Sequence, residues 1–190
     1  MKIICLGDSL TAGYNLRREE NWVELLNRET PDQWLNAGVS GDTSTGLVAR
    51  LSAEVLPQRP DEVLFMGGDN DILLTGSADQ AKSAVMAMIH QCAARGVRPV
   101  VGIAFPLLDV PEVWRPVCDW QRASREMHQQ VLWLRRLVQA LSLRHVDFAA
   151  AFDGNGGPAL YQPDGMHPNA AGCRVMADAV KQALYHHYRG

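Results

Sequence analysis

The side chains best suited to chemistry are a serine and a histidine that stand far apart in the chain. Ser9 follows the apolar run of residues 3–6, and His167 comes three residues after Asp164. A serine hydroxyl becomes an effective nucleophile when a base takes its proton, and a histidine, with an ordinary pKa of about 6.5, can do this near neutral pH. Asp164 can fold back within the same turn and orient the imidazole, as the aspartate of a serine-protease triad does. These three residue types therefore predict acyl transfer through a serine nucleophile.

Acyl transfer also needs hydrogen-bond donors for the oxyanion of the tetrahedral intermediate. Gly41 and Asn70 lie in glycine-rich polar turns. The backbone N–H groups of Ser9 and Gly41 and the side-chain amide of Asn70 could supply three donors, each worth on the order of 3 kcal/mol of barrier. We therefore expect Ser9, Gly41 and Asn70 to form an oxyanion hole.

Short apolar runs that end in polar turns predict the strands that would position these residues. The runs occupy residues 3–7, 34–39, 61–66, 99–105 and 146–150. Helical segments separate them, and this alternation predicts a parallel sheet with helices on both faces and right-handed crossovers. Because the carboxyl ends of parallel strands lie at one edge of a sheet, the polar turns should meet in one crevice.

The fold class expected is therefore α/β, a three-layer α/β/α sandwich with a five-stranded parallel sheet. The strand order 2-1-3-4-5 is predicted by analogy with flavodoxin-like folds. No Pro/Gly/Ser-rich linker divides residues 1–190, which predicts a single domain. Ser77 and Gln80 have the spacing of a capping box at the start of a helix. An earlier helix, which follows the turn around Gly41, should stop at Pro57. The proline-rich residues 106–119 predict a surface loop at the carboxyl edge, where Trp114 could line an acyl pocket.

Composition excludes several classes of function. Apolar residues make up 47% of the chain and the formal net charge is −3, without a Lys/Arg run that could bind a nucleic acid. The four cysteines are widely spaced, which predicts reduced structural thiols. We read no signal peptide and no membrane span, and expect a cytoplasmic protein with no cofactor and no metal. The pair His186 and His187 lacks a third ligand at suitable spacing, so we interpret it as a frayed helix end.

The polar turns, taken in order, resemble the sequence blocks of the GDSL, or SGNH, hydrolase family. The blocks are Gly-Asp-Ser-Leu at residues 7–10, the segment around Gly41, Gly-Asp-Asn-Asp at residues 68–71 and Asp-Gly-Met-His at residues 164–167. The resemblance implies a flavodoxin-like sandwich and metal-free hydrolysis of small or lipid-like esters or thioesters through an acyl-enzyme. It also implies Ser9 as nucleophile, His167 as base, Asp164 as its orienting partner, and Gly41 and Asn70 as oxyanion donors. Residues 10–14 look most like the bacterial thioesterase/lysophospholipase branch.

One position departs from the family pattern, and two other functions stay open. The variable position of the Gly-x-Asn-Asp block is commonly small or uncharged, but here it is Asp69, which we expect to point to solvent. A carbohydrate O-deacetylase could use the same triad, because the shape of the pocket sets the leaving group. A non-enzymatic flavin or phosphate binder is a remote alternative, since residues 9–13 resemble a hydroxyl-rich anion-binding loop. That alternative explains neither Asn70 nor the pairing of Asp164 with His167.

Overall fold

Five parallel strands form a single sheet in the order β2-β1-β3-β4-β5. The structure is a computed structural model, and it describes residues 1–185 of the 190 in the sequence. The strands are β1 (Lys2–Gly7), β2 (Gln33–Gly38), β3 (Glu62–Met66), β4 (Arg98–Ile103) and β5 (Arg144–Asp147). The predicted fold class and strand order are confirmed. His186 and His187 lie outside the described residues.

β1 is an inner strand whose register places its end beside the ends of both neighbours. Gly7, its last residue, pairs with Gly38 of β2 and with Met66 of β3. All five residues of β3 are buried, as is expected of a strand with helices on both faces. The three strand ends therefore place the turns after β1, β2 and β3 next to one another.

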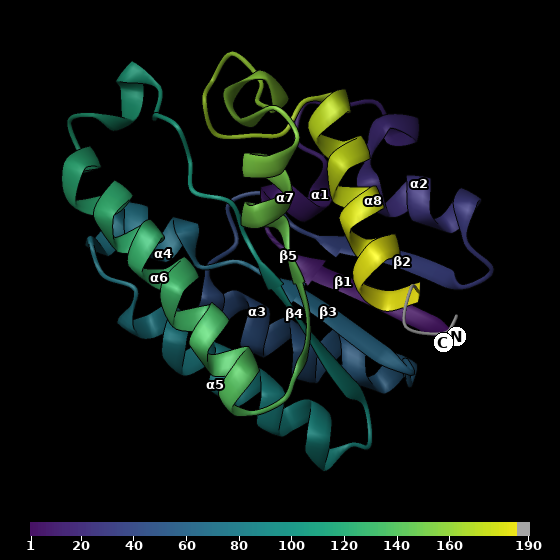
Figure 1. Cartoon of the computed structure of the whole chain (residues 1–190). Coiled ribbons are helices and arrows are strands. Elements are labelled where there is room, and N and C mark those ends of the chain that lie inside the picture. The colour runs from purple at the N-terminus through teal and green to yellow at the C-terminus, as the bar shows by residue number, and fades with distance from the viewer. Residues whose placement is uncertain (186–190) are drawn as a thin grey trace.

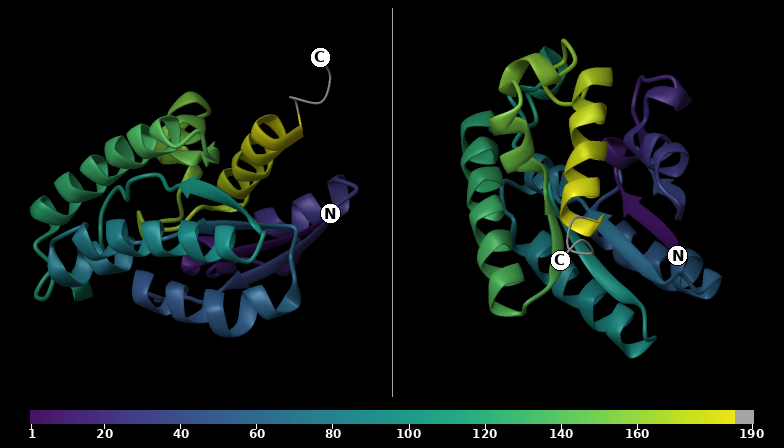
Figure 2. Two further views of the ribbon diagram at one scale, coloured as in Figure 1. Left: turned by 90° about the horizontal axis from the view of Figure 1, so that it is seen from below. Right: turned by 45° about the vertical axis from the view of Figure 1, so that its right-hand side comes forward.

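Helices cover both faces of the sheet. One layer holds α2 (Trp22–Glu29), α7 (Phe148–Gly154) and α8 (Ala170–Tyr185), and the other holds α3 (Ser44–Arg50), α5 (Asp79–Ala94) and α6 (Trp120–Ala140). Figure 1 shows α5 and α6 on one side of the strands, with α2 and α8 on the other. The right-hand view of Figure 2 shows α6 and α8 running along opposite sides of β5.

Two short helices stand where the sequence predicts none. α4 (Asp69–Thr75) begins within the turn predicted after β3. α7 begins at Phe148, inside the run predicted as the fifth strand, because the side chain of Asp147 accepts the backbone N–H of Ala150 and caps a helix there. Asp69 was predicted in a turn and Asp147 in a strand, whereas in the structure Asp69 begins α4 and Asp147 immediately precedes α7.

Two predicted helix boundaries differ slightly from the structure. The capping box of Ser77 and Gln80 forms only in part: the Ser77 hydroxyl accepts the backbone N–H of Asp79 at 3.2 Å, where α5 begins, but the Gln80 side chain donates to the Thr45 hydroxyl. The helix predicted to stop at Pro57 continues from α3 through a π-helical turn (Leu51–Val55) and a 3-10 turn (Leu56–Gln58). Pro57 lies in that last turn and, because it has no N–H, it interrupts the backbone hydrogen bonds that run up to Leu56.

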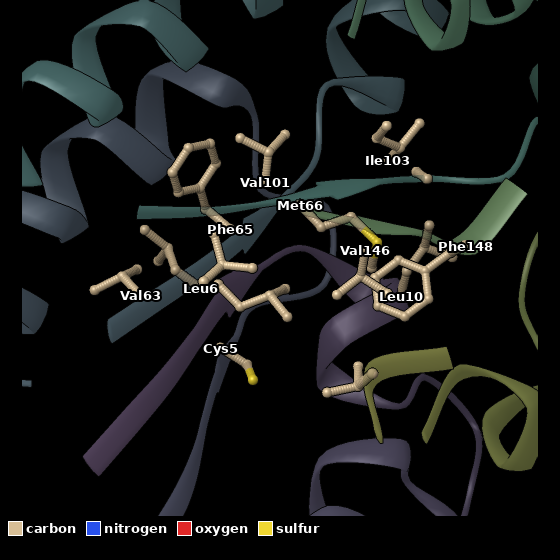
Figure 3. Close-up of a cluster of buried hydrophobic side chains, with 14 of the residues drawn as sticks. Cys5, Leu6, Leu10, Val63, Phe65, Met66, Val101, Ile103, Val146 and Phe148 are labelled. Atoms are coloured by element: carbon tan, nitrogen blue, oxygen red, sulfur yellow. The ribbon is translucent and has the colours of Figure 1, made fainter. Parts of the chain in front are cut away.

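The main core lies between the sheet and both helical layers. Figure 3 shows Leu6, Phe65 and Val101 from three neighbouring strands packed with one another, and Phe148 beside Leu10. A second, smaller cluster lies beneath the loop of residues 106–119 and joins Ile72 and Leu73 of α4 to Met127 of α6. The four cysteines are buried and free, as predicted. In the part of the chain that the structure describes, no helix is both long and apolar enough to cross a bilayer.

Candidate active site

Ser9, His167 and Asp164 form a continuous hydrogen-bonded chain. Nε2 of His167 lies 2.9 Å from Oγ of Ser9, and Nδ1 of the same ring lies 2.7 Å from Oδ2 of Asp164. With a proton on Nδ1, the imidazole donates to Asp164 and can accept the proton of the Ser9 hydroxyl at Nε2. The structure thus brings together three residues that the sequence places at opposite ends of the chain.

Ser9 stands on a tight turn from β1 into the short helix α1 (Ser9–Ala12). The carboxylate of Asp8 accepts the backbone N–H of Leu10 at 2.9 Å and caps that helix. Gly7 is required because an added Cβ would lie 2.1 Å from the Thr11 hydroxyl oxygen. The turn therefore fixes the direction in which the Ser9 hydroxyl leaves the sheet.

Backbone hydrogen bonds position the Asp164 carboxylate independently of its contact with the imidazole. Its Oδ1 accepts the backbone N–H groups of Met166 and His167 at 2.9 and 3.0 Å, which leaves Oδ2 for the His167 ring. Partial burial alone would raise the pKa of Asp164, but these hydrogen bonds outweigh that effect and lower it. The carboxylate form that orients the imidazole is therefore the favoured form.

Tyr14 is a site residue that the sequence did not single out. Its ring lies against the His167 imidazole with centroids 4.4 Å apart. Its backbone carbonyl accepts the side-chain amide of Gln162, which also donates to the carbonyl of Pro168. Tyr14 and Gln162 thus tie the loop after α1 to the loop that carries His167. No spacing in the sequence indicates this contact.

Asn70 and the loop of Gly41 meet beside Ser9. Asn70 lies in the first turn of α4 and lines the same small pocket as Ser9 and His167. Its amide nitrogen donates at 2.8 Å to the backbone carbonyl of Asp42, the residue that follows Gly41. Gly41 has φ +80°, a left-handed conformation that favours glycine, but it is not among the residues that line the pocket.

The largely buried Arg50 side chain stabilises the loop that carries Gly41 through several hydrogen bonds. Its guanidinium bonds to the Asp42 carboxylate at 2.7–2.8 Å and to the backbone carbonyls of Ala37 and Gly7 at 2.8 and 3.0 Å. The side chains of Arg50 and Asp42 are only 16% and 13% exposed. Arg50 therefore connects the ends of β1 and β2 to the loop that follows β2.

Asp71 fixes the far end of the same loop. Its two carboxylate oxygens accept the backbone N–H and the hydroxyl of Ser44, at 2.8 and 2.7 Å. Asp71 therefore holds the start of α3, 27 residues earlier in the chain, and not its own turn. Because Asn70 and Asp71 bond to successive parts of the loop, α4 and the loop are positioned as one unit.

The pocket at the reacting atoms is small, about 10 Å³. Its apolar walls come from Leu10, Leu73, Leu107 and Met166. Trp114, which the sequence suggested as a pocket wall, does not line it. The indole instead packs, half-buried, against the second cluster under the loop of residues 106–119.

Asp69 does not point to solvent, contrary to expectation. It is only 8% exposed and lines the pocket with Ser9 and Asn70. Burial raises its pKa to about 8, and the nearby carboxylates of Asp8 and Asp71 add to the shift. The prediction failed because it took Asp69 for a turn residue, whereas Asp69 begins α4 and its side chain faces inward.

The titratable groups of the described residues do not gather into a metal site, since no three His, Cys, Asp or Glu side chains there come close enough together. The Ser9 hydroxyl, the His167 ring and the Asp164 carboxylate are instead paired with one another or with backbone groups. The groups that line this crevice are a hydroxyl, an imidazole, two carboxyl groups and a side-chain amide.

A family model described as GDSL-like Lipase/Acylhydrolase matches residues 5–175. "Esterase TesA" of Pseudomonas aeruginosa is 32% identical over 110 residues, which cover 55% of this chain and 55% of that protein. "Thioesterase 1/protease 1/lysophospholipase L1" of Escherichia coli K12 is 33% identical over 105 residues, covering 52% and 49%. The matched region thus spans about half the length of these curated relatives.

Solved structures extend the likeness of fold to almost the whole chain. A member of the lipolytic protein G-D-S-L family from Veillonella parvula superposes with a TM-score of 0.81 at 20% identity, covering 97% of this chain and 98% of that one. At that identity, the likeness shows the fold alone.

Proposed function

The chain belongs to the GDSL-like lipase/acylhydrolase family, and we propose that it hydrolyses carboxylic esters or thioesters through an acyl-enzyme formed on Ser9. The observation that carries this proposal is the distance of 2.9 Å between Ser9 Oγ and His167 Nε2, with Asp164 bonded to the other ring nitrogen. A hydroxyl within hydrogen-bond reach of an oriented base is the arrangement that nucleophilic catalysis requires.

The first half of the proposed reaction acylates Ser9. His167 Nε2 takes the hydroxyl proton as Ser9 Oγ attacks the substrate carbonyl carbon, and Asp164 stabilises the imidazolium that forms. The backbone N–H groups of Ser9 and Gly41 and the Asn70 amide donate to the oxyanion. The tetrahedral intermediate then collapses, and the leaving alcohol or thiol takes the proton from His167 Nε2.

The second half regenerates the serine. Water attacks the acyl carbonyl as His167 Nε2 accepts one of its protons, and the new oxyanion meets the same donors. Collapse releases a carboxylic acid, and the proton returns from Nε2 to Ser9 Oγ. Each half thus transfers one proton to Nε2 and one proton from it.

Asn70 uses one amide N–H on the carbonyl of Asp42, and its second N–H is the one proposed for the oxyanion. The bond to Asp42 sets the orientation of the amide, so the donor is already aimed when the charge develops. Such preorganisation avoids a reorganisation cost during the reaction.

The substrate proposed is a small ester or thioester, because the pocket beside Ser9 is small and has four apolar side chains among the residues that line it. A panel of p-nitrophenyl acetate, acetyl thioesters and acetylated sugars, each measured with wild type and with Ser9→Ala, tests both the activity and the leaving group. Turnover that disappears in Ser9→Ala supports the proposal. Preference for acetylated sugars would favour the O-deacetylase, and activity retained by Ser9→Ala would contradict the mechanism.

A further inference from the structure

Asp69 lies between two small cavities. One is the catalytic pocket of about 10 Å³ where Ser9 meets His167. The other, also about 10 Å³, lies between the end of β4 and α6. Besides Asp69 and Gln130, its lining is apolar and consists of Ala104, Phe105, Pro106, Met127, Val131 and Leu134. Because Asp69 lines both cavities, its side chain forms part of the wall between them.

Gln130 of α6 supports this wall from the inner side. It is 5% exposed, and its amide nitrogen donates to the backbone carbonyl of Gly67 at 3.3 Å. A Cβ at Gly68 would lie 2.7 Å from the same nitrogen. The start of α4 therefore packs directly against Gln130, with no room for another side chain between them.

The wall is polar but suits an uncharged carboxyl better than a carboxylate. Within residues 1–185, neither Oδ2 of Asp69 nor Oε1 of Gln130 has a hydrogen-bond partner, although both are buried. A neutral Asp69 carboxyl would avoid the cost of burying a negative charge that no partner among the described residues compensates. The raised pKa of Asp69, about 8, agrees with a neutral side chain near neutral pH.

We propose that Asp69 ends the acyl-binding pocket and restricts this enzyme to short acyl groups. This proposal rests on the proposed function and specifies its substrate class. An acyl chain on Ser9 would share the pocket with Leu73, Leu107 and the polar Asp69 side chain, and it could reach the inner cavity only past Asp69. Methylene groups there would lie against a polar side chain instead of apolar ones, so the wall offers them little of the stabilisation that an apolar pocket gives. Behind Asp69, the inner cavity offers the apolar contacts that a longer chain would need.

The test is kcat/KM for p-nitrophenyl esters from acetyl to decanoyl. Wild type should prefer acetyl and butanoyl. Asp69→Ala should join the two cavities and raise the hexanoyl-to-acetyl ratio at least about tenfold, since even one methylene accommodated in a pocket changes discrimination about 10- to 200-fold. Asp69→Asn keeps the size and polarity of the wall and should keep the wild-type ratio. Asp69→Ser also shortens the side chain and replaces Asp69→Ala should that variant not fold.

Two controls separate this effect from a general disturbance. Leu74 lies on the same helix but is 60% exposed, so Leu74→Ala should leave the ratio unchanged. Acetate esters of increasingly long alcohols should respond equally in wild type and Asp69→Ala, because the change concerns the acyl side.

Several results would overturn the proposal. A wild type that hydrolyses decanoyl esters as well as butanoyl esters contradicts it whatever the variants do. Equal ratios in Asp69→Ala and wild type contradict it, as does a gain confined to the alcohol series. If wild type hydrolyses esters of every chain length no faster than Ser9→Ala does, the proposed function is overturned, and this proposal with it.

Discussion

The Asn70 side-chain amide donates to the backbone carbonyl of Asp42 at 2.8 Å, although 28 residues separate the two positions. The bond ties the first turn of α4 to the loop that carries Gly41. Two of the proposed oxyanion donors, one from a side chain and one from the backbone, therefore depend on each other for position.

Replacing Asn70 by Ala should lower kcat about 10²- to 10³-fold, because one oxyanion donor is lost and the Gly41 loop is released. KM should change much less, since the oxyanion exists only in the transition state and intermediate. Steady-state kinetics on a short ester check this expectation. A rise in KM at constant kcat would show that Asn70 binds the ground state instead.

Ser9 and His167 should act as one unit. Ser9→Ala and His167→Ala should each remove nearly all turnover, and the double variant should be no slower than either alone. Asp164→Asn should cost less, because Asp164 orients the ring and does not touch the substrate. A double variant far slower than both single variants would mean that the two residues contribute independently.

Trp114→Ala should affect stability more than specificity. The indole packs on the cluster of Ile72, Leu73 and Met127 and does not line the catalytic pocket. Because it is only half-buried, we expect a loss on the order of 1–3 kcal/mol in the free energy of unfolding, below that of a fully buried Trp. The butanoyl-to-acetyl ratio of kcat/KM should stay constant. A tenfold change in that ratio would make Trp114 a pocket wall after all.

Asp69→Asn should stabilise the protein increasingly as pH rises. The folded pKa of Asp69, about 8, is above the ordinary value of 3.8, so between these values the folded state binds more protons than the unfolded state. The free energy of unfolding of wild type should therefore fall from about pH 4 to pH 8, and Asn removes this contribution. Since one pKa unit corresponds to about 1.4 kcal/mol, the gap at pH 9 should exceed that figure.

Urea unfolding at pH 5, 7 and 9 measures this gap. Asp79→Asn is a matched control, because the Asp79 side chain is 89% exposed and its replacement should give no comparable trend. A gap for Asp69→Asn that does not grow with pH would show that burial does not hold the carboxyl neutral.

The sheet was predictable because its signals are local and mutually consistent. β1 and β3 are short apolar runs buried on both faces, and each ends in a glycine-rich turn. α4 was missed because Asp and Asn favour both turns and the first turn of a helix, and tertiary packing decides between them. The start of α7 was missed because an apolar run such as residues 146–150 fits a buried strand or a buried helix equally well.

The triad residues could be proposed from their types and order, but their environment could not. The burial of Asp69 depends on Gln130, 61 positions later in the sequence, which packs against the start of α4. The contact of Tyr14 with His167 depends likewise on the path of two loops. Such contacts between distant segments leave no periodic trace in a sequence.

The central claim is that Ser9 is a nucleophile activated by His167, and labelling with an alkyl fluorophosphonate tests it most directly. Peptide mapping by mass spectrometry should place one phosphonyl group on Ser9 of wild type. Ser9→Ala should remain unlabelled, and His167→Ala should react at least about 100-fold more slowly, as loss of the general base predicts. Label on another residue, or equal rates in wild type and His167→Ala, would contradict the account.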